Sequence, residues 1–474
     1  MNMTTKEQPE KRSFSADTVI DDFTNIFFIG IGGIGMSNLA RYFLANKKIV
    51  GGYDRISSTL SRQLEAEGAL IHYQDNIETV PARFLDALTT LVIYTPAVPK
   101  TNTELVYFKQ NGFTVIKRAQ ALGEITKLSR AICCAGTHGK TTVSSMVAHI
   151  LRQSRVDCSA FLGGILKNYK SNLLISETSD ITVIEADEYD RSFHWLHPWI
   201  GIITSADHDH LDIYPTTKLY RESFEEFTEL VREDGFLIMK KGIDVTHRCH
   251  ESVKQYTYSL CEGDFYADKI HLGKGTLLFD FVYPGGVIKD INLGVPLIIN
   301  AENAVVAAAA AWLSGAEPEE IKDALSSYQG AKRRFDLRFK SEEIVFIDDY
   351  AHHPNELTAS IMSIKKLYND KKITGIFQPH LYSRTRDFVN EFAKSLSLLD
   401  ELILLDIYPA REEPIEGVTS QIIFDKVTIK NKTLCKKSEL LELMKDKRPE
   451  VLVTLGAGDI DTLLPDIEKI VRRL

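Results

Sequence analysis

The chain has 474 residues, with 56 Lys and Arg against 65 Asp and Glu, and therefore a formal charge of −9. This length corresponds to about three domains and excludes a single small module, and the acidic balance argues against non-specific nucleic-acid binding, which requires clustered basic residues. The longest apolar run, Ala304–Leu313, is far shorter than the roughly 20 residues of a membrane-spanning helix. We therefore expect no membrane span and, since the N-terminus lacks the apolar stretch of a secretory signal, a cytoplasmic location.

Apolar, β-prone stretches alternate with helical patterns after a polar tail at residues 1–20. This alternation is typical of α/β domains with mostly parallel sheets. Between about 265 and 295, short alternating runs separated by glycine-rich turns predict a small antiparallel meander. Domain boundaries are expected near residues 125 and 331. The predicted strands are Ile26–Ile29, Ile49–Tyr53, Leu91–Thr95, Ala131–Ala135, Val183–Ala186, Ile200–Thr204, Ile344–Ile347, Ile373–Phe377, Leu402–Asp406 and Val451–Leu455.

A glycine-rich loop, FFIGIGGIG, follows the first predicted strand. Gly30, Gly32 and Gly35 match GxGxxG, and a helical pattern, Met36–Leu44, begins directly behind them. Such a loop lets the backbone approach a pyrophosphate at a helix N-terminus, where free N–H groups and the helix dipole favour anions. Asp54, at the end of the next strand, stands where an acid binds ribose hydroxyls. By itself the pattern is compatible with a dinucleotide, another nucleotide diphosphate or a structural turn.

A second loop, AGTHGKTT, leads from a predicted strand into a helix with one apolar face. The strict Walker pattern would need glycine at position 134, where this chain has Cys134, so the match is to a shorter loop, GTxGKT. Its physics is the same, because Gly139 permits an unusual backbone, successive N–H groups form an anion nest, and Lys140 reaches the β- and γ-phosphates. A threonine hydroxyl would bind Mg²⁺. The alternative is a structural turn with a solvated lysine, and the position between strand and helix favours an ATP loop.

Acidic and histidine side chains gather at the ends of later strands. Glu185 lies in EADEYD, and a DHDHLD segment follows the next strand. Carboxylates beside a phosphate loop suit Mg²⁺, which takes oxygen ligands and keeps several waters. The alternatives are a zinc site, which has no Cys partner here, and a solvated acidic loop. A further polar strand end, DYAHHP at 349–354, is either part of a site or a proline-terminated turn.

A nucleotide-diphosphate loop, an ATP loop and a magnesium cluster on one chain fit an ATP-driven ligase rather than a dehydrogenase. The sequence resembles the Mur ligase family along nearly its whole length, from about Asn25 to Leu464. The motifs that carry the resemblance occur in this order: IGIGGIGMS, AGTHGKTT, EADEYDRSF, DHLDIY, the Asn300–Ala304 segment, RRFD, DDYAHHPNE, FQPHLYSRTRD, DIYPAREEPIEGV and LGAGDI.

The resemblance implies a three-domain α/β fold. An N-terminal Rossmann-like domain at 21–125 would bind the UDP-sugar, and a central P-loop ATPase-like domain at 126–330 would hold ATP on a mostly parallel sheet with a small antiparallel addition. A C-terminal Rossmann-like domain at 331–474 would close on ATP and the amino acid.

The resemblance also implies the roles of individual residues. Lys140, His210 and His353 are the expected catalytic residues, the histidines as helpers in removing the amine proton. Thr141, Glu185 and His210 would bind Mg²⁺, and Tyr350 and Arg384 would border the amino-acid pocket. The expected ATP-binding residues are Gly136, Thr137, His138, Gly139, Lys140, Thr141, Thr142, Asn303, Arg334 and Asp349, and those for the UDP-sugar are Gly30, Gly32, Gly33, Gly35, Met36 and Asp54.

The implied reaction joins L-alanine to the lactyl carboxylate of UDP-N-acetylmuramate through an acyl phosphate made from ATP, in peptidoglycan precursor synthesis. The implied protein is a monomer or weak homodimer. The nearest rival hypothesis is a murein-peptide recycling ligase that adds a preformed tripeptide to the same UDP-sugar. More distant rivals are an NAD-dependent oxidoreductase, which only GxGxxG and Asp54 support, and a non-catalytic nucleotide-binding regulator.

Overall fold

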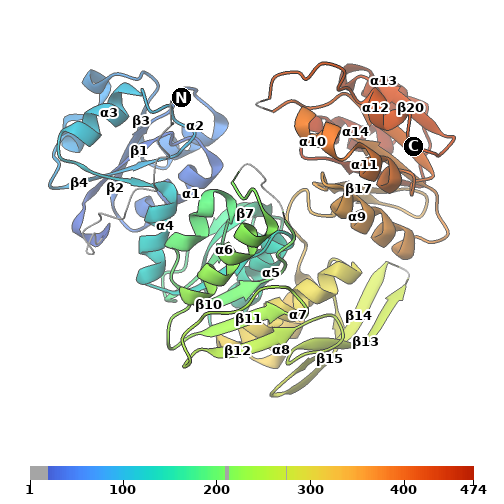
Figure 1. The fold of residues 1–474 in the computed structure, drawn as a ribbon, viewed down its shortest axis with the longest axis horizontal. Coiled ribbons are helices and arrows are strands. Elements are labelled where there is room, and N and C mark those ends of the chain that lie inside the picture. Colours follow the sequence, from blue (N-terminus) through green and yellow to red (C-terminus); the bar gives the residue numbers. More distant parts are fainter. Residues whose placement is uncertain (1–19, 209–212, 274, 411, 474) are drawn as a thin grey trace, which may run out of the picture. The chain divides into compact units, whose positions relative to one another are not determined.

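The computed structural model describes residues 20–208, 213–273, 275–410 and 412–473, and it confirms a mixed α/β fold with mostly parallel sheets (Figure 1). The chain divides into two compact units, one made of Met1–Ser129 with His194–His197 and the other of Arg130–Phe193 with Pro198–Leu474. Within the described residues, no helix is long and apolar enough to cross a membrane.

The first unit is built on a five-stranded sheet in the order β3-β2-β1-β4-β5, in which every pair is parallel. One face buries an aromatic cluster of Phe27, Phe84 and Phe108. The chain runs outward from β1 to β2 and β3 on one side of the sheet, and β4 and β5 lie on the other side of β1. The strand order therefore reverses at the end of β1, and ligands bind at such topological switch points in parallel sheets. Its elements are β1 Asn25–Ile29, α1 Ile34–Ala45, β2 Ile49–Tyr53, α2 Thr59–Ala66, β3 Leu70–His72, β4 Thr90–Tyr94, α3 Thr103–Gln110, β5 Thr114–Lys117 and α4 Arg118–Lys127.

The short segment His194–His197 returns to this first unit from a distant part of the sequence. The backbone N–H of His197 donates to Thr126 Oγ1 at 3.0 Å, and a Cβ at Gly123 would collide with the Trp195 carbonyl. Glycine on α4 therefore allows this segment to pack closely against the helix.

The second unit contains a seven-stranded central sheet in the order β12-β11-β10-β6-β9-β7-β8, parallel except for the β7–β8 pair. β6 lies between β9 and β10, so the ends of these three strands form one edge. The elements are β6 Arg130–Ala135, α5 Lys140–Gln153, β7 Ser159–Leu166, β8 Ser171–Leu174, β9 Ile181–Glu185, β10 Pro198–Ile203, α6 Thr217–Glu229, β11 Phe236–Lys240 and β12 Lys254–Tyr258.

The meander predicted near 265–295 is present as a separate three-stranded antiparallel sheet, not as an extension of the central sheet. It consists of β13 Tyr266–Gly273, β14 Thr276–Tyr283 and β15 Gly286–Asn292. The helices α7 Ile298–Leu313 and α8 Pro318–Ser327 pack against it and against α5 (Figure 1). Eleven residues of α7, mostly alanines, are buried, because small side chains let the helix pack closely between the two layers.

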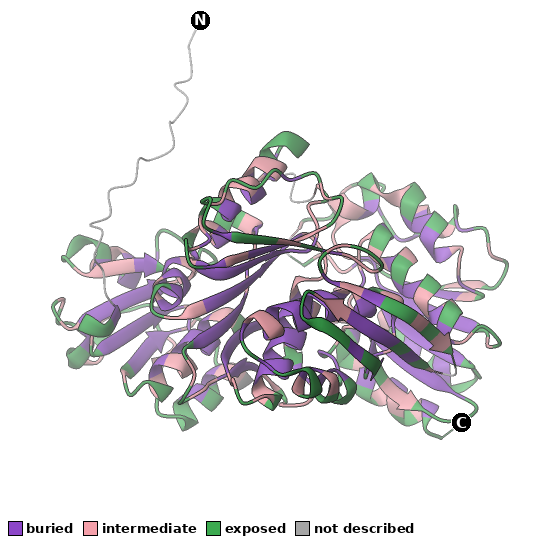
Figure 2. Cartoon of the chain, turned by 90° about the horizontal axis from the view of Figure 1, so that it is seen from below, coloured by how far each residue is buried: buried purple, intermediate pink, exposed green. Residues whose placement is uncertain are grey.

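The remaining sheet of this unit has the order β16-β17-β21-β18-β19-β20, parallel except for β16. The strands of all the larger sheets are mainly buried and the helices expose their outer faces (Figure 2). The elements are β16 Asp336–Lys340, β17 Val345–Asp349, α9 Pro354–Leu367, β18 Ile373–Phe377, α10 Tyr382–Asp387, α11 Val389–Leu396, β19 Glu401–Leu405, α12 Gln421–Phe424, β20 Lys432–Cys435, α13 Leu440–Lys445, β21 Val451–Leu455 and α14 Leu464–Val471.

All ten predicted strands are present, with ends that shift by one or two residues. The sequence patterns missed mainly strands at sheet edges, such as β3, β8, β12 and β20. Edge strands bury only part of their side chains, so they lack the continuous apolar runs of central parallel strands. The predicted domain boundaries stay predictions.

Candidate active site

The loop between β6 and α5 has the backbone of an anion-binding nest. Gly136 and Gly139 adopt φ values of 137° and 87°, in the region that favours glycine. A Cβ at Gly136 would collide with the Thr204 hydroxyl at the end of β10. α5 then begins at Lys140 and runs for 14 residues with its apolar face buried. Its first N–H groups and its dipole therefore point at the space above the loop, where they favour an anion.

Lys140 is held in this loop by a buried carboxylate. Its Nζ donates to the Gly136 carbonyl at 2.7 Å and lies 2.7 Å from Oε2 of Glu188. Glu188 is 1% exposed and follows β9 directly. The ammonium group thus has anionic compensation before any phosphate is bound.

Thr141 and Glu185 form a pair of oxygen donors beside the loop. The Thr141 hydroxyl donates to Glu185 Oε1 at 3.0 Å, and the N–H of Gly163 on β7 donates to Oε2 at 3.0 Å. A Cβ at Gly163 would collide with the carboxylate. Burial raises the pKa of Glu185, although the charges of Lys140 and Arg334 and the Thr141 hydrogen bond oppose the rise.

This pair suits Mg²⁺, which commonly takes one or two protein oxygen ligands and completes its shell with substrate phosphates and waters. In the part of the chain that the structure describes, no group of three or more His, Cys, Asp or Glu residues is arranged around a metal position. His210, the third predicted ligand, lies outside the described residues.

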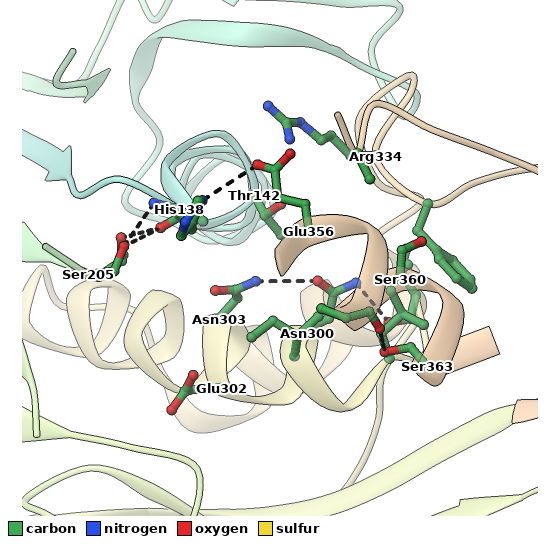
Figure 3. Close-up of a pocket in the computed structure, with 18 of the residues that line it drawn as sticks. His138, Thr142, Ser205, Asn300, Glu302, Asn303, Arg334, Glu356, Ser360 and Ser363 are labelled. Carbon is green, nitrogen blue, oxygen red and sulfur yellow. Dashed lines mark hydrogen bonds and ion pairs between the residues drawn. The ribbon is translucent and has the colours of Figure 1, made fainter. Parts of the chain in front are cut away.

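A cavity of about 340 Å³ opens beside the loop (Figure 3). It brings together six of the predicted ATP residues, namely His138, Gly139, Thr142, Asn303, Arg334 and Asp349, whereas Gly136, Thr137, Lys140 and Thr141 do not line it. Asn303 and Asn300 project from α7, with Asn303 Nδ2 donating to Asn300 Oδ1 at 3.4 Å. Lys240 and Glu302 pair at 2.8 Å on the cavity wall, which also has apolar side chains such as Leu297. A wall with amide groups, one ion pair and apolar surface can hold a heterocyclic base.

The segment before β16 and the end of β17 contribute Arg334 and Asp349 to this cavity. Ser360 Oγ donates to Asp349 Oδ2 at 2.5 Å, and the Phe335 N–H donates to Oδ1 at 3.4 Å. Burial raises the pKa of Asp349, with the Ser360 hydrogen bond and the Arg334 charge opposing it. The Tyr350 ring lies 5.1 Å from the Arg334 guanidinium, a cation–π contact that positions the arginine.

The predicted amino-acid pocket residues lie around one histidine of the last sheet. The Tyr350 ring is 5.3 Å from the His352 ring, and the charge of Arg384, on α10, contributes to a lowered pKa of His352 whose largest cause is burial. His353 is the N-cap of α9, where its Nδ1 accepts from the Asn355 N–H at 3.4 Å. Its role as a proton acceptor stays a prediction.

In the first unit, the GxGxxG loop bends at the end of β1. Gly30 has a φ of 87°, and α1 begins just after Gly33. Asp54 Oδ2 accepts from the Gly32 N–H at 2.7 Å, so this carboxylate stabilises the loop itself. Met36 is 2% exposed and belongs to the core. Whether Asp54 also binds ribose hydroxyls stays a prediction.

Two acidic residues of the site were not among those expected from the sequence. Glu188 lies three positions after Glu185 in the same motif, and Glu356 lies three positions after His353. The spacing from His353 to Glu356 is that of a capping box, which the structure contains at the start of α9. The capping-box spacing could have been recognised in the sequence. The pairing of Glu188 with Lys140 could not, because it depends on which strands are neighbours in the sheet.

A strand–loop–helix nest with a lysine, beside a hydroxyl–carboxylate pair and a base-sized cavity, defines an ATP-dependent ligase once the comparisons with known proteins are added. Residues 25–130 match the model of the Mur ligase family catalytic domain, 134–311 the Mur ligase middle domain, and 333–458 the Mur ligase glutamate ligase domain. The chain belongs to the Mur ligase family.

Individual relatives are similar over nearly the full length. UDP-N-acetylmuramate–L-alanine ligase of Parabacteroides distasonis is 61% identical over 95% of this chain and 98% of its own, and the enzyme of the same name from Phocaeicola vulgatus is 55% identical over 94% and 98%. Among solved structures, the UDP-N-acetylmuramate-alanine ligase of Thermotoga maritima superimposes with a TM-score of 0.77 at 27% identity, covering 95% of this chain and 98% of that one.

Proposed function

We propose that the protein joins L-alanine to the lactyl carboxylate of UDP-N-acetylmuramate at the expense of ATP. The observation that carries the proposal is the 61% identity, over 95% of the chain, to a ligase of that name. The phosphate loop and the Thr141–Glu185 pair support the chemistry, since amide formation from a carboxylate requires activation by a phosphoryl group. The murein-peptide ligase of Psychrobacter arcticus shares the fold at 22% identity, whereas the relatives at 61% and 55% identity are named alanine ligases, which favours alanine over a tripeptide as acceptor.

The first step phosphorylates the sugar-borne acid. A carboxylate oxygen attacks the γ-phosphorus, the bond to the β-phosphate oxygen breaks, and ADP leaves. Lys140 exchanges its contact with Glu188 for the phosphates and stabilises the charge that develops on their oxygens. Thr141 and Glu185 would hold Mg²⁺, which would neutralise part of the charge on the phosphates.

The second step forms the amide. The neutral amine of L-alanine attacks the acyl carbon, and the tetrahedral intermediate releases inorganic phosphate after the nitrogen loses a proton. Tyr350 and Arg384 would border the amino acid, and His353 or His210 would accept the proton. The acyl phosphate must be shielded from water, so we infer that the C-terminal domain closes during turnover. A cytoplasmic protein, monomeric or weakly dimeric, fits these soluble substrates.

A phosphate-release assay tests the proposal. The purified protein is incubated with ATP, Mg²⁺ and UDP-N-acetylmuramate, together with either L-alanine or the preformed tripeptide, and products are weighed by mass spectrometry. We expect phosphate release with L-alanine and a product heavier by one alanyl residue. Lys140→Ala should lose turnover by orders of magnitude, whereas Lys218→Ala, whose side chain is 84% exposed on α6, should not. Release with the tripeptide alone, or nucleotide-dependent redox activity without ATP hydrolysis, would refute the proposal.

A further inference from the structure

The carboxylate of Glu356 joins two elements of the second unit. Its Oε2 accepts from the backbone N–H groups of His352 and His353, at 3.1 and 3.3 Å, and so caps the N-terminus of α9. Its Oε1 lies 3.5 Å from Nδ1 of His138 in the phosphate loop. Figure 3 shows the side chain projecting from α9 across the cavity toward that loop. Glu356 therefore bridges the loop after β6 and the helix after β17.

The backbone of His138 is held by two residues that follow β10. Its backbone N–H donates to Ser205 Oγ at 2.8 Å, and its carbonyl accepts from the Thr204 hydroxyl. The contact with Glu356 is an ion pair rather than a well-aligned hydrogen bond, since Nδ1 lacks a partner in hydrogen-bond geometry. The two side chains therefore interact mainly through their charges.

The charges around the pair favour the imidazolium and the carboxylate. Burial works to lower the pKa of His138, but the direct contact with the Glu356 carboxylate, the charge of Glu356 and the charge of Asp207 outweigh burial and Lys140 and hold this pKa above its usual value. Burial works to raise the pKa of Glu356, but His138, His352 and the His352 N–H, with Arg334, hold it well below its usual range. The charged and titratable groups that face the pair are Lys140 on α5, Asp207 after β10, Arg334 before β16, Asp349 at the end of β17, His352, and His353, whose ring lies 6.4 Å from that of His138.

We propose that Glu356 is a positioning residue that, through His138, couples binding of the nucleotide phosphates to the seating of α9 and of the amino-acid pocket beside it. The inference rests on the proposed function. A triphosphate in the nest places a second anion next to the His138 imidazolium, which then lies between the phosphates and Glu356. Attraction on both sides draws the N-terminus of α9 toward the occupied loop, and α9 follows directly on the segment that carries Tyr350. Such coupling between two sites is reciprocal.

The test uses Glu356→Gln, which keeps an acceptor for the two N–H groups of α9 and removes the charge. We expect the KM for L-alanine at saturating ATP to rise roughly five- to tenfold, the range of modest coupling energies. His138→Asn should raise it equally, and the double variant should be no worse than either single one, because each substitution removes the same interaction. Glu391→Gln, an exposed acid in the first turn of α11, is the matched control.

Calorimetric binding of a non-hydrolysable ATP analogue adds a readout that needs no turnover. In the wild type the affinity should fall as pH rises through the His138 pKa, because the imidazolium is lost. In Glu356→Gln the midpoint of this fall should move to lower pH. An unchanged midpoint, an unchanged alanine KM, or single effects that multiply in the double variant would overturn the inference. If the wild-type protein shows no turnover on alanine, the proposed function is refuted but the coupling is not. The shift of the pH midpoint in the calorimetric titrations would then still test the role of Glu356.

Discussion

Replacing Lys140 by alanine should destabilise the protein as well as inactivate it. The substitution leaves the Glu188 carboxylate, 1% exposed, without the ammonium group now 2.7 Å away. Removing one partner of a buried ion pair costs about 3–5 kcal/mol. The Lys140 side chain is 13% exposed, so water can reach the vacated position, and we expect the lower end, about 3 kcal/mol. For a domain of roughly 200 residues, a loss of about 3 kcal/mol corresponds to a fall in melting temperature of roughly 6–12 °C.

Thermal unfolding of the ligand-free protein measures this effect. Lys140→Ala/Glu188→Gln removes both charges and should recover most of the lost stability without recovering turnover. The exposed-site control Lys218→Ala should melt like the wild type. If Lys140→Ala alone melts like the wild type, or if the double variant is no more stable than the single one, the pair does not stabilise the empty site.

Three further predictions concern single residues. Asp54→Ala removes the acceptor of the Gly32 N–H, so UDP-N-acetylmuramate affinity should fall roughly tenfold in calorimetry while ATP affinity stays the same; equal losses would contradict this. Gly163→Ala displaces the Glu185 carboxylate and should lower kcat at least about tenfold. The control Gly273→Ala has open space around its Cβ position and should keep the wild-type kcat. Similar kcat values for both variants would show that Gly163 is not needed to make room for Glu185. Burial raises the pKa of Glu104 from 4.5 to about 8, so its contribution to stability is full below pH 4.5 and is lost as the pH rises through 8. In thermal melts from pH 5 to 9, Glu104→Gln should therefore show a smaller fall in melting temperature with pH than the wild type. An equal fall in both proteins would refute this prediction.

Both glycine-rich loops could be predicted because their conformations depend on local sequence. GxGxxG and GTHGKTT each place glycine, N–H groups and a helix start within one short stretch of chain, so the conformation depends on residues that are adjacent in sequence. The same is true of the central strands, whose apolar runs reflect burial on both faces. The antiparallel meander was visible in its turns, yet its existence as a separate sheet packed on α7 and α8 was not.

The sequence by itself determined the family, the α/β class and the two glycine-rich loops between strand and helix, since contiguous motifs encode them. Only the tertiary structure decided the partners of their charges. Lys140 meets Glu188 because β6 and β9 are neighbours, and His138 meets Glu356 because α9 begins beside the loop. Asp54, predicted to bind a ribose, accepts from the Gly32 N–H, a contact that the motif alone did not indicate. Charges act through distance in space, and the order of strands in a sheet, which sets that distance, is not written in any local pattern.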